Sequence, residues 1–248
     1  MRKNHLFTTL FVLLCVVLIS FVKPGNRAAA TTSAATLLVT DTAVATAPAA
    51  PSLTETLYSN LKLEERGLSK EALDYAVQGY EKLVAEGAVA NTQYLTLIDF
   101  SQNGRQKRFY LIDVPNQQLV KNTFVSHGKN SGLDKAENFS NTINSEQSSL
   151  GFYVTGPTYT GKHGLSLRLQ GQEEGFNSNA MARGIVVHGA AYVNAGRVNS
   201  AFMGRSQGCP ALPESEYEEV IDYIKNGTVL FIYHPSEAYL QQSPVLNN

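Results

Sequence analysis

The sequence predicts a mainly β domain, a small sandwich or barrel, with an N-terminal helical extension and one late helix. From Asn91 onward, short runs of β-branched and aromatic residues alternate with turn sequences such as SQNGRQ and PNQQ. Between residues 69 and 87, apolar residues recur instead at helical spacing. After Pro213, the segment ESEYEEVIDYIKNG has acidic residues in its first turn and apolar residues on one face, which is typical of a helix.

The first 30 residues have the composition of a secretory signal. The short basic start MRKNH precedes the apolar run LFTTLFVLLCVVLISFV, and the alanines at 28–30 fit a cleavage site. This run is long for a cleaved signal and short for a comfortable membrane span, so an uncleaved anchor remains open. Cys15 lies inside the run and is interpreted as part of the signal. We therefore expect a periplasmic or otherwise exported protein, released or held at the membrane by this segment.

Residues 31–52 are rich in Ala and Thr and low in charge, which predicts a flexible linker. Loss of residues 1–30 would remove four basic residues and no acidic one, which changes the formal charge from −1 to −5. Because the remainder is acidic and contains no basic run, nucleic acid is not expected as a partner. The length after the linker suits one domain with an appendage, and we expect a monomer.

Residues 53–90 are predicted to form the helical extension. Ser69 is a suitable N-cap and Gly87 a suitable stop for its longer helix. The apolar residues between them recur at helical spacing: Leu73, Ala76, Val77, Tyr80, Leu83 and Val84. This pattern is typical of a helical pair packed on a main domain, and we expect no catalytic residue in it.

The main domain is expected over residues 91–235, followed by a C-terminal tail at 236–248. Its strand candidates are QYLTLIDF, KRFYLIDV, LVKNTFVS, LGFYVTG (150–156), LSLRLQG (165–171), GIVVHG (184–189) and TVLFIY (228–233). The late helix is expected to end near Lys225 and Gly227. Short strands with glycine-rich corners favour a small sandwich or barrel.

Cys209 is the one cysteine that follows the predicted signal. An unpaired cysteine in an exported protein indicates either pairing between molecules or a reactive thiol. Pro210 favours an extended or turn conformation at Cys209, and Gly208 allows a ligand to approach the backbone closely. These neighbours suit a nucleophile beside an oxyanion hole, although a buried inert cysteine would also fit the local sequence.

His188 favours the nucleophile interpretation, because it ends an apolar run and is followed by Gly189. An imidazole near a thiol promotes its deprotonation, and the thiolate is the attacking species. We therefore expect an accessible Cys209 thiol with a lowered pKa. The other histidines form no metal-binding motif such as HExxH, and the glycines form no phosphate-binding loop, so neither a metal nor a cofactor is expected.

The segment VVHGAAYVNAGRVNSAFMGRSQGCP (186–210) resembles the active-site segment of the YkuD-type L,D-transpeptidase catalytic domain. That family carries a His, a spacer and then Ser/Thr-His-Gly-Cys. Here 17 residues separate His188 from Ser206, and Gly208-Cys209 ends the motif. SSLGFYVTG (148–156) is similar to an earlier strand of the family, and further blocks across 91–235 are similar to a divergent murein L,D-transpeptidase-like branch. The resemblance implies the β fold of that family.

The resemblance also implies roles for the motif residues. Cys209 would be the nucleophile and His188 the general base, with the Gly189 carbonyl orienting the imidazole. Backbone amides at Gly208 and Cys209 would hold the oxyanion, and Ser206 would hydrogen-bond within the loop. The implied reaction is acyl transfer on peptidoglycan stem peptides through a Cys209 thioester, with D-Ala as the leaving group. Carbapenem-type β-lactams, which acylate members of this family, are implied as ligands.

The sequence departs from the family motif at two points. Gln207 stands where the motif has its second His. Pro210-Ala211 replaces an aliphatic and a polar residue, and the Arg that often follows is missing. This puts the substrate and the choice between transfer and hydrolysis in question. Arg205 and Arg183 are candidates to supply the missing cation.

His127, in HGKNSG, has the same His-Gly context as His188. It is a candidate for lining the pocket, and a structural role is the alternative. The spacing to Ser206-x-Gly-Cys fits only His188, so His188 is the predicted base.

Three functions remain open on the sequence. A cysteine transpeptidase of peptidoglycan is the leading one. A hydrolase on the same fold would cut wall crosslinks or protein anchors instead. A non-catalytic peptidoglycan-binding module is the alternative of another class, and the presence of both Cys209 and His188 speaks against it.

Overall fold

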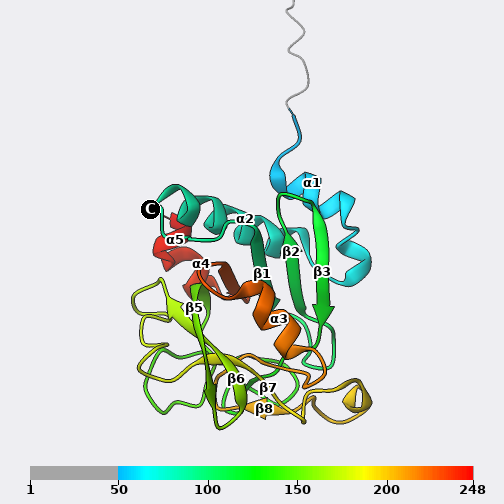
Figure 1. The fold of residues 1–248 in the computed structure, drawn as a ribbon, viewed down its shortest axis with the longest axis vertical. Helices are drawn as coiled ribbons and strands as arrows, with labels where there is room; N and C mark the ends of the chain where they lie inside the picture. The colour runs from blue at the N-terminus through cyan, green and yellow to red at the C-terminus, as the bar shows by residue number, and fades with distance from the viewer. Residues whose placement is uncertain (1–49, 248) are drawn as a thin grey trace, which may run out of the picture. The chain divides into compact units, whose positions relative to one another are not determined.

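The structure is a computed structural model that describes residues 50–247 (Figure 1). The predicted signal, Cys15 and most of the predicted linker fall in residues 1–49, outside the described residues. Over the span 50–247, no helix combines the length and the hydropathy needed to cross a membrane.

The helical extension consists of two α-helices joined by a short 3-10 turn. α1 covers Leu53–Asn60, η1 covers Glu64–Arg66 and α2 covers Lys70–Ala85. The side chain of Ser69 accepts a hydrogen bond from the Ala72 amide, so the predicted N-cap is confirmed. The predicted stop is confirmed as well, because Gly87 follows the helix end with a φ of +71°, which favours glycine.

The main domain is built on one eight-stranded sheet, so the predicted mainly β, barrel-like class is confirmed. The strand order is β3-β2-β1-β10-β5-β6-β7-β9, and β4 and β8 form a separate pair. The bounds are β1 Tyr94–Asp99, β2 Phe109–Asp113, β3 Gln118–Thr123, β4 His127–Gly128, β5 Gly151–Gly161, β6 Gly164–Gly171, β7 Val186–Gly189, β8 Arg205–Ser206, β9 Ala211–Leu212 and β10 Val229–Tyr233. All seven predicted strands are present, whereas β4, β8 and β9 are too short to show a periodic pattern.

Strands that are close in sequence pair as antiparallel hairpins, as their turn sequences predict. β1 pairs with β2, β2 with β3, and β5 with β6. Three parallel pairings join more distant segments: β1 with β10, β7 with β9, and β4 with β8. Local sequence does not mark these parallel pairings, because each depends on residues far apart in the chain.

The central strands β1 and β10 are buried along almost their whole length, which requires cover on both faces. α2 packs against both strands, and α3 (Tyr217–Ile224) packs against β1, β6 and β7 (Figure 1). α3 is the predicted late helix, and it ends just before Lys225 as expected.

The C-terminal segment, for which the sequence predicts no element, forms two short helices, α4 (Glu237–Gln242) and α5 (Pro244–Asn247). Helices of this length show no reliable apolar period. Both are attached to the domain through Glu173, a fully buried carboxylate. Glu173 accepts hydrogen bonds from the Phe152 amide at 2.6 Å, from the Tyr239 hydroxyl at 3.0 Å and from the Ser243 hydroxyl.

Close packing of α2 on the sheet depends on Gly79. A Cβ added at Gly79 would lie 2.1 Å from Cζ of Phe152. The ring of Phe152 in turn stacks on Phe231 of β10, with centroids 4.0 Å apart and 8° between the ring planes. Both rings are fully buried in a close-packed core, so neither can move aside without cost.

We expect Gly79→Ala to lower the free energy of unfolding by about 1–3 kcal/mol, the usual cost of overpacking a core. This loss should occur although alanine is the better helix former. Urea unfolding of the full-length protein measures it. Asp74→Ala, at an exposed position of the same helix, is the matched control and should change the midpoint little. An unchanged or raised midpoint for Gly79→Ala would contradict the packing described here.

Candidate active site

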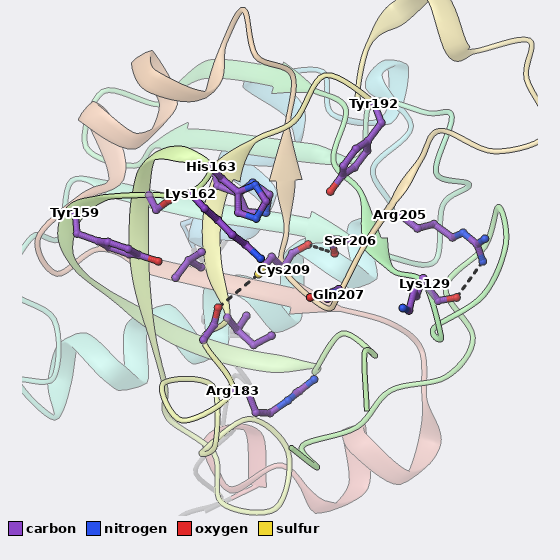
Figure 2. Close-up of a pocket in the computed structure, with 15 residues that line it drawn as sticks. Lys129, Tyr159, Lys162, His163, Arg183, Tyr192, Arg205, Ser206, Gln207 and Cys209 are labelled. Atoms are coloured by element: carbon purple, nitrogen blue, oxygen red, sulfur yellow. Dashed lines mark hydrogen bonds between the residues drawn. The ribbon is translucent and has the colours of Figure 1, made fainter. Parts of the chain in front are cut away.

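A cavity of about 520 Å³ opens beside Cys209 (Figure 2). Its wall includes five candidates from the sequence: Arg183, His188, Arg205, Ser206 and Cys209. The wall also includes Lys129, Tyr159, Lys162, His163 and Tyr192, for which the sequence predicts no role, and Gln207, the departure from the motif. The structure therefore brings together residues from segments spread over 80 positions of the chain.

The pairing of β7 with β9 brings Cys209 and His188 to the same cavity. His188 pairs with Ala211 in parallel register, and Cys209 precedes Ala211 by two residues. Cys209 lies in a bend between β8 and β9, which agrees with the conformation expected before Pro210. Cys209, the nucleophile candidate, thus lies just before β9 and beside the end of β7, which carries the base candidate His188.

The imidazole of His188 is held by the backbone that follows it. Its Nδ1 lies 2.8 Å from the carbonyl oxygen of Gly189, the contact that the family resemblance implies. Because a carbonyl oxygen only accepts, Nδ1 carries the proton and Nε2 is left as the acceptor. Burial lowers the pKa of His188, the Gly189 hydrogen bond raises it, and the charges of His163 and Lys162 lower it further. The ring is therefore neutral near pH 7 and able to take a proton at Nε2.

The space beside Gly189 is occupied by protein. A Cβ added at Gly189 would lie 2.5 Å from Cδ1 of Tyr217, on helix α3. The side of Gly189 that a side chain would occupy is therefore filled by the ring of Tyr217. Gly189 instead allows α3 to pack closely against the strand that carries His188.

Two serine hydroxyls shape the loop that carries Cys209. Ser206 Oγ accepts a hydrogen bond from the Gly208 amide at 3.0 Å and donates one to the Cys209 carbonyl oxygen at 2.6 Å. Ser148 Oγ donates to the Gly208 carbonyl oxygen at 3.1 Å. The amide of Gly208 is thus already paired, which argues against the expectation that it helps to hold an oxyanion. The Cys209 amide, which lowers the pKa of its own thiol in the resting site, is the remaining candidate for that purpose.

Gly208 itself is required by the shape of this loop. Its φ of +122° favours glycine, and an added Cβ would lie 2.7 Å from the Gln147 carbonyl oxygen. The conformation places the Cys209 side chain at the cavity wall, where it is partly exposed.

Burial raises the pKa of the Cys209 thiol above its ordinary value. The Val186 amide and the charges of Arg183 and Lys162 lower it, but by less. The predicted lowered pKa is therefore wrong for the resting site, because the cost of desolvating a thiolate outweighs the nearby cations. The thiol donates a hydrogen bond to the Gly184 carbonyl oxygen, 3.7 Å from Sγ. The resting site thus holds a neutral thiol and a neutral imidazole.

Arg183 and Arg205 both lie at the cavity and are both fixed by neutral oxygens. Arg183 donates to the carbonyl oxygens of Ser140 and Gln147 and to the hydroxyls of Ser145 and Ser149. Arg205 donates to the Lys129 carbonyl oxygen at 3.0 Å and to the Gly132 carbonyl oxygen at 3.2 Å. Neither guanidinium has a carboxylate partner among residues 50–247. Both can therefore interact with an anionic group in the cavity.

The remaining cations of the wall are Lys129 and Lys162. Lys129 forms an ion pair with Glu146 at 2.6 Å. Lys162, at the tip of the β5–β6 hairpin, has no ion-pair partner in the described part of the chain, and its side chain points toward Cys209 (Figure 2). No carboxylate lines this cavity within the described residues. The Cys209 thiol, which is partly exposed, is thus surrounded by basic side chains although the domain as a whole is acidic.

His127 lies in the core, not at the cavity. It is 1% exposed, its Nδ1 accepts from Nη2 of the buried Arg108 at 2.7 Å, and its Nε2 lies 3.3 Å from the Gly132 carbonyl oxygen. Burial and the charge of Arg108 lower the pKa of His127 to about 4. His127 therefore does not line this cavity, and the structural alternative is the one that fits: both nitrogens are already paired, and β4, which carries His127, pairs with β8.

A model of the L,D-transpeptidase catalytic domain matches residues 64–233. A comparison with curated proteins gives no match.

Similar solved structures include an L,D-transpeptidase from Mycobacterium smegmatis, with 13% identity and a TM-score of 0.37 over 57% of this chain and 59% of that chain. Another is an L,D-transpeptidase from Mycobacterium tuberculosis H37Rv, with 11% identity and a TM-score of 0.36 over 57% and 58%. A third is the LD transpeptidase LdtMt1 in complex with imipenem, with 13% identity and a TM-score of 0.35 over 57% and 59%. This chain therefore spans less than two thirds of each of these structures. The family match, however, covers more than half of this chain and contains the cavity, Cys209 and His188, so the chain belongs to the L,D-transpeptidase catalytic-domain family.

Proposed function

We propose that this protein is an exported cysteine acyltransferase that acts on peptidoglycan stem peptides. The observation that carries the proposal is the cavity shared by Cys209 and His188, with Nδ1 of His188 held on the Gly189 carbonyl. This arrangement leaves Nε2 as a proton acceptor beside the single thiol of the described chain. A nucleophile with an oriented base is the arrangement needed for covalent acyl transfer.

The resting thiol and imidazole are both neutral, so His188 acts as a general base during attack. The thiol turns from Gly184 toward the ring and passes its proton to Nε2 while Sγ bonds to the acyl carbonyl carbon. The carbonyl electrons move to the oxygen, and the Cys209 amide is placed to stabilise this oxyanion. When the carbonyl reforms, the C–N bond to D-Ala breaks, and the imidazolium returns the proton to the leaving amine.

The thioester is resolved by a second nucleophile. The amine of another stem peptide attacks the thioester carbonyl, gives a proton to His188, and the sulfur leaves as the thiol. Water in the same place gives hydrolysis. The acceptor therefore decides between a transpeptidase and a hydrolase.

The charge of the cavity supports a substrate that carries a carboxylate. Lys162, Arg183 and Arg205 lie in its wall without carboxylate partners in the described chain. A C-terminal D-Ala leaving group carries a free carboxylate, and guanidinium groups bind carboxylates well. We assign to these cations the role of the Arg that is missing after Cys209, which is to bind the substrate.

Peptidoglycan lies outside the cytoplasmic membrane, so the proposed substrate requires export. The basic start and apolar run of residues 1–30 support a periplasmic or otherwise exported location, either with the signal removed or with it kept as an anchor.

Purified sacculi should change on incubation with the wild-type protein and not with Cys209→Ala. Mass analysis of the digested products is the measurement. New crosslinks are the expected result and show transfer, whereas loss of crosslinks or of anchored protein would show hydrolysis by the same thioester. Binding to sacculi without any product from either protein would contradict the proposed catalysis.

A carbapenem should acylate Cys209, which intact-mass measurement detects as one adduct on the wild type and none on Cys209→Ala.

We expect His188→Ala to lower the acylation rate by roughly 10²–10⁴-fold, the range for loss of general acid–base help. His127→Ala should lower the thermal transition, because it removes the partner of buried Arg108, and should cost less in acylation rate per folded molecule. Loss of acylation in His127→Ala, with His188→Ala near the wild type, would reverse this assignment.

A further inference from the structure

We propose that His163 is a positioning residue whose ring holds the imidazole of His188 in the orientation that serves Cys209. The inference rests on the proposed role of His188 as the base. His163 lies at the tip of the β5–β6 hairpin, between Gly161 and Gly164, and this hairpin brings it over the cavity (Figure 2).

The rings of His163 and His188 are stacked. Their centroids lie 4.4 Å apart and their planes are inclined by 22°. The position of the hairpin is set by the sheet, because Ser166, three residues after His163, pairs with His188 across β6 and β7. The stack is therefore supported by the pairing of the two strands that carry these residues.

The imidazole of His188 needs such support because the torsion that turns a histidine ring has only broad, shallow preferences. The Gly189 carbonyl holds one edge of the ring through Nδ1. A flat ring against the face of the imidazole opposes rotation out of that hydrogen bond. Together the two contacts keep Nε2 directed into the cavity, where the thiol must deliver its proton.

The hairpin also acts on the charge of the base. Lys162 and His163 face His188 from the hairpin, Cys209 and Arg183 line the same cavity from two other loops, and Tyr217 lies against Gly189 from α3. The charges of His163 and Lys162 lower the pKa of His188, in addition to the larger effect of burial. The hairpin therefore favours the neutral form of the base that the reaction requires.

His163 supplies a second imidazole to a site in which Gln207 replaces the second His of the motif. Gln207 occupies the position of the motif's second His, and its amide side chain is exposed and cannot titrate in the physiological range. Within residues 50–247, His163 is the histidine other than His188 that lines the cavity. The second imidazole of this site thus comes from a hairpin that is separate from the motif.

The test measures the limiting rate of Cys209 acylation at saturating carbapenem as a function of pH. The full-length wild type is compared with His163→Ala, His163→Phe and His188→Ala. Thr160→Ala, an exposed position on the same hairpin outside the cavity wall, is the matched control. The side chain of His163 is exposed, so the variants should fold, and matched thermal transitions verify this.

His163→Ala should lower the plateau rate roughly tenfold, because the base loses its fixed orientation. His163→Phe should restore the plateau, since a phenyl ring can stack in the same place. In both variants the acidic limb of the profile should move to higher pH. The sign follows from the lost charge: without it the pKa of His188 rises, and the base becomes neutral only at higher pH.

Three results would overturn the inference, and they have different meanings. If His188→Ala is slow while His163→Ala keeps the wild-type plateau, His163 does not position the base and the proposed function stands. If His163→Phe is as slow as His163→Ala, stacking is not the working contact. If His188→Ala itself matches the wild type, the proposed function fails and this inference fails with it.

Discussion

The candidate active site depends on one parallel backbone pairing, between β7 and β9. The register sets His188 against Ala211 and Gly189 against Leu212, and the Ala190 amide donates to the Leu212 carbonyl oxygen at 2.8 Å. Because side chains alternate across a strand, a slip of one residue would turn His188 to the opposite face and separate it from the thiol. The packing of Tyr217 against Gly189 holds the same edge from the side of α3. The relative position of His188 and Cys209 therefore depends directly on this strand register.

The electrostatics of the cavity keep both the Cys209 thiol and the His188 imidazole uncharged at rest. Burial raises the pKa of Cys209 and lowers that of His188, so desolvation keeps both neutral. The nearby cations Lys162 and Arg183 oppose this effect at the sulfur. A neutral thiol is also less reactive toward oxidants and electrophiles than a thiolate would be.

Local sequence predicts the hairpins, the Ser69 cap and the motif spacing that singles out Cys209 and His188, because each depends on neighbouring residues. It does not predict features that depend on distant partners. His127 carries the same His-Gly signature as His188, yet the buried Arg108 places it in the core. The direction of the Cys209 pKa depends on burial, which no local motif encodes. His163 occupies a glycine-flanked turn, where the sequence indicates only a change of direction.

The position of β10 in the sheet has a consequence for biosynthesis. β10 is the last strand of the domain to leave the ribosome, yet it lies in the centre of the sheet and pairs with β1 on one side and β5 on the other. Within the sheet, the β1–β2–β3 strands and the β5–β6–β7 strands are therefore not joined until β10 emerges. Pairings between such distant segments are slow to form. Until β10 is made, the edges of β1 and β5 that it will join are unpaired, and a nascent chain of this fold needs protection of those edges during that interval.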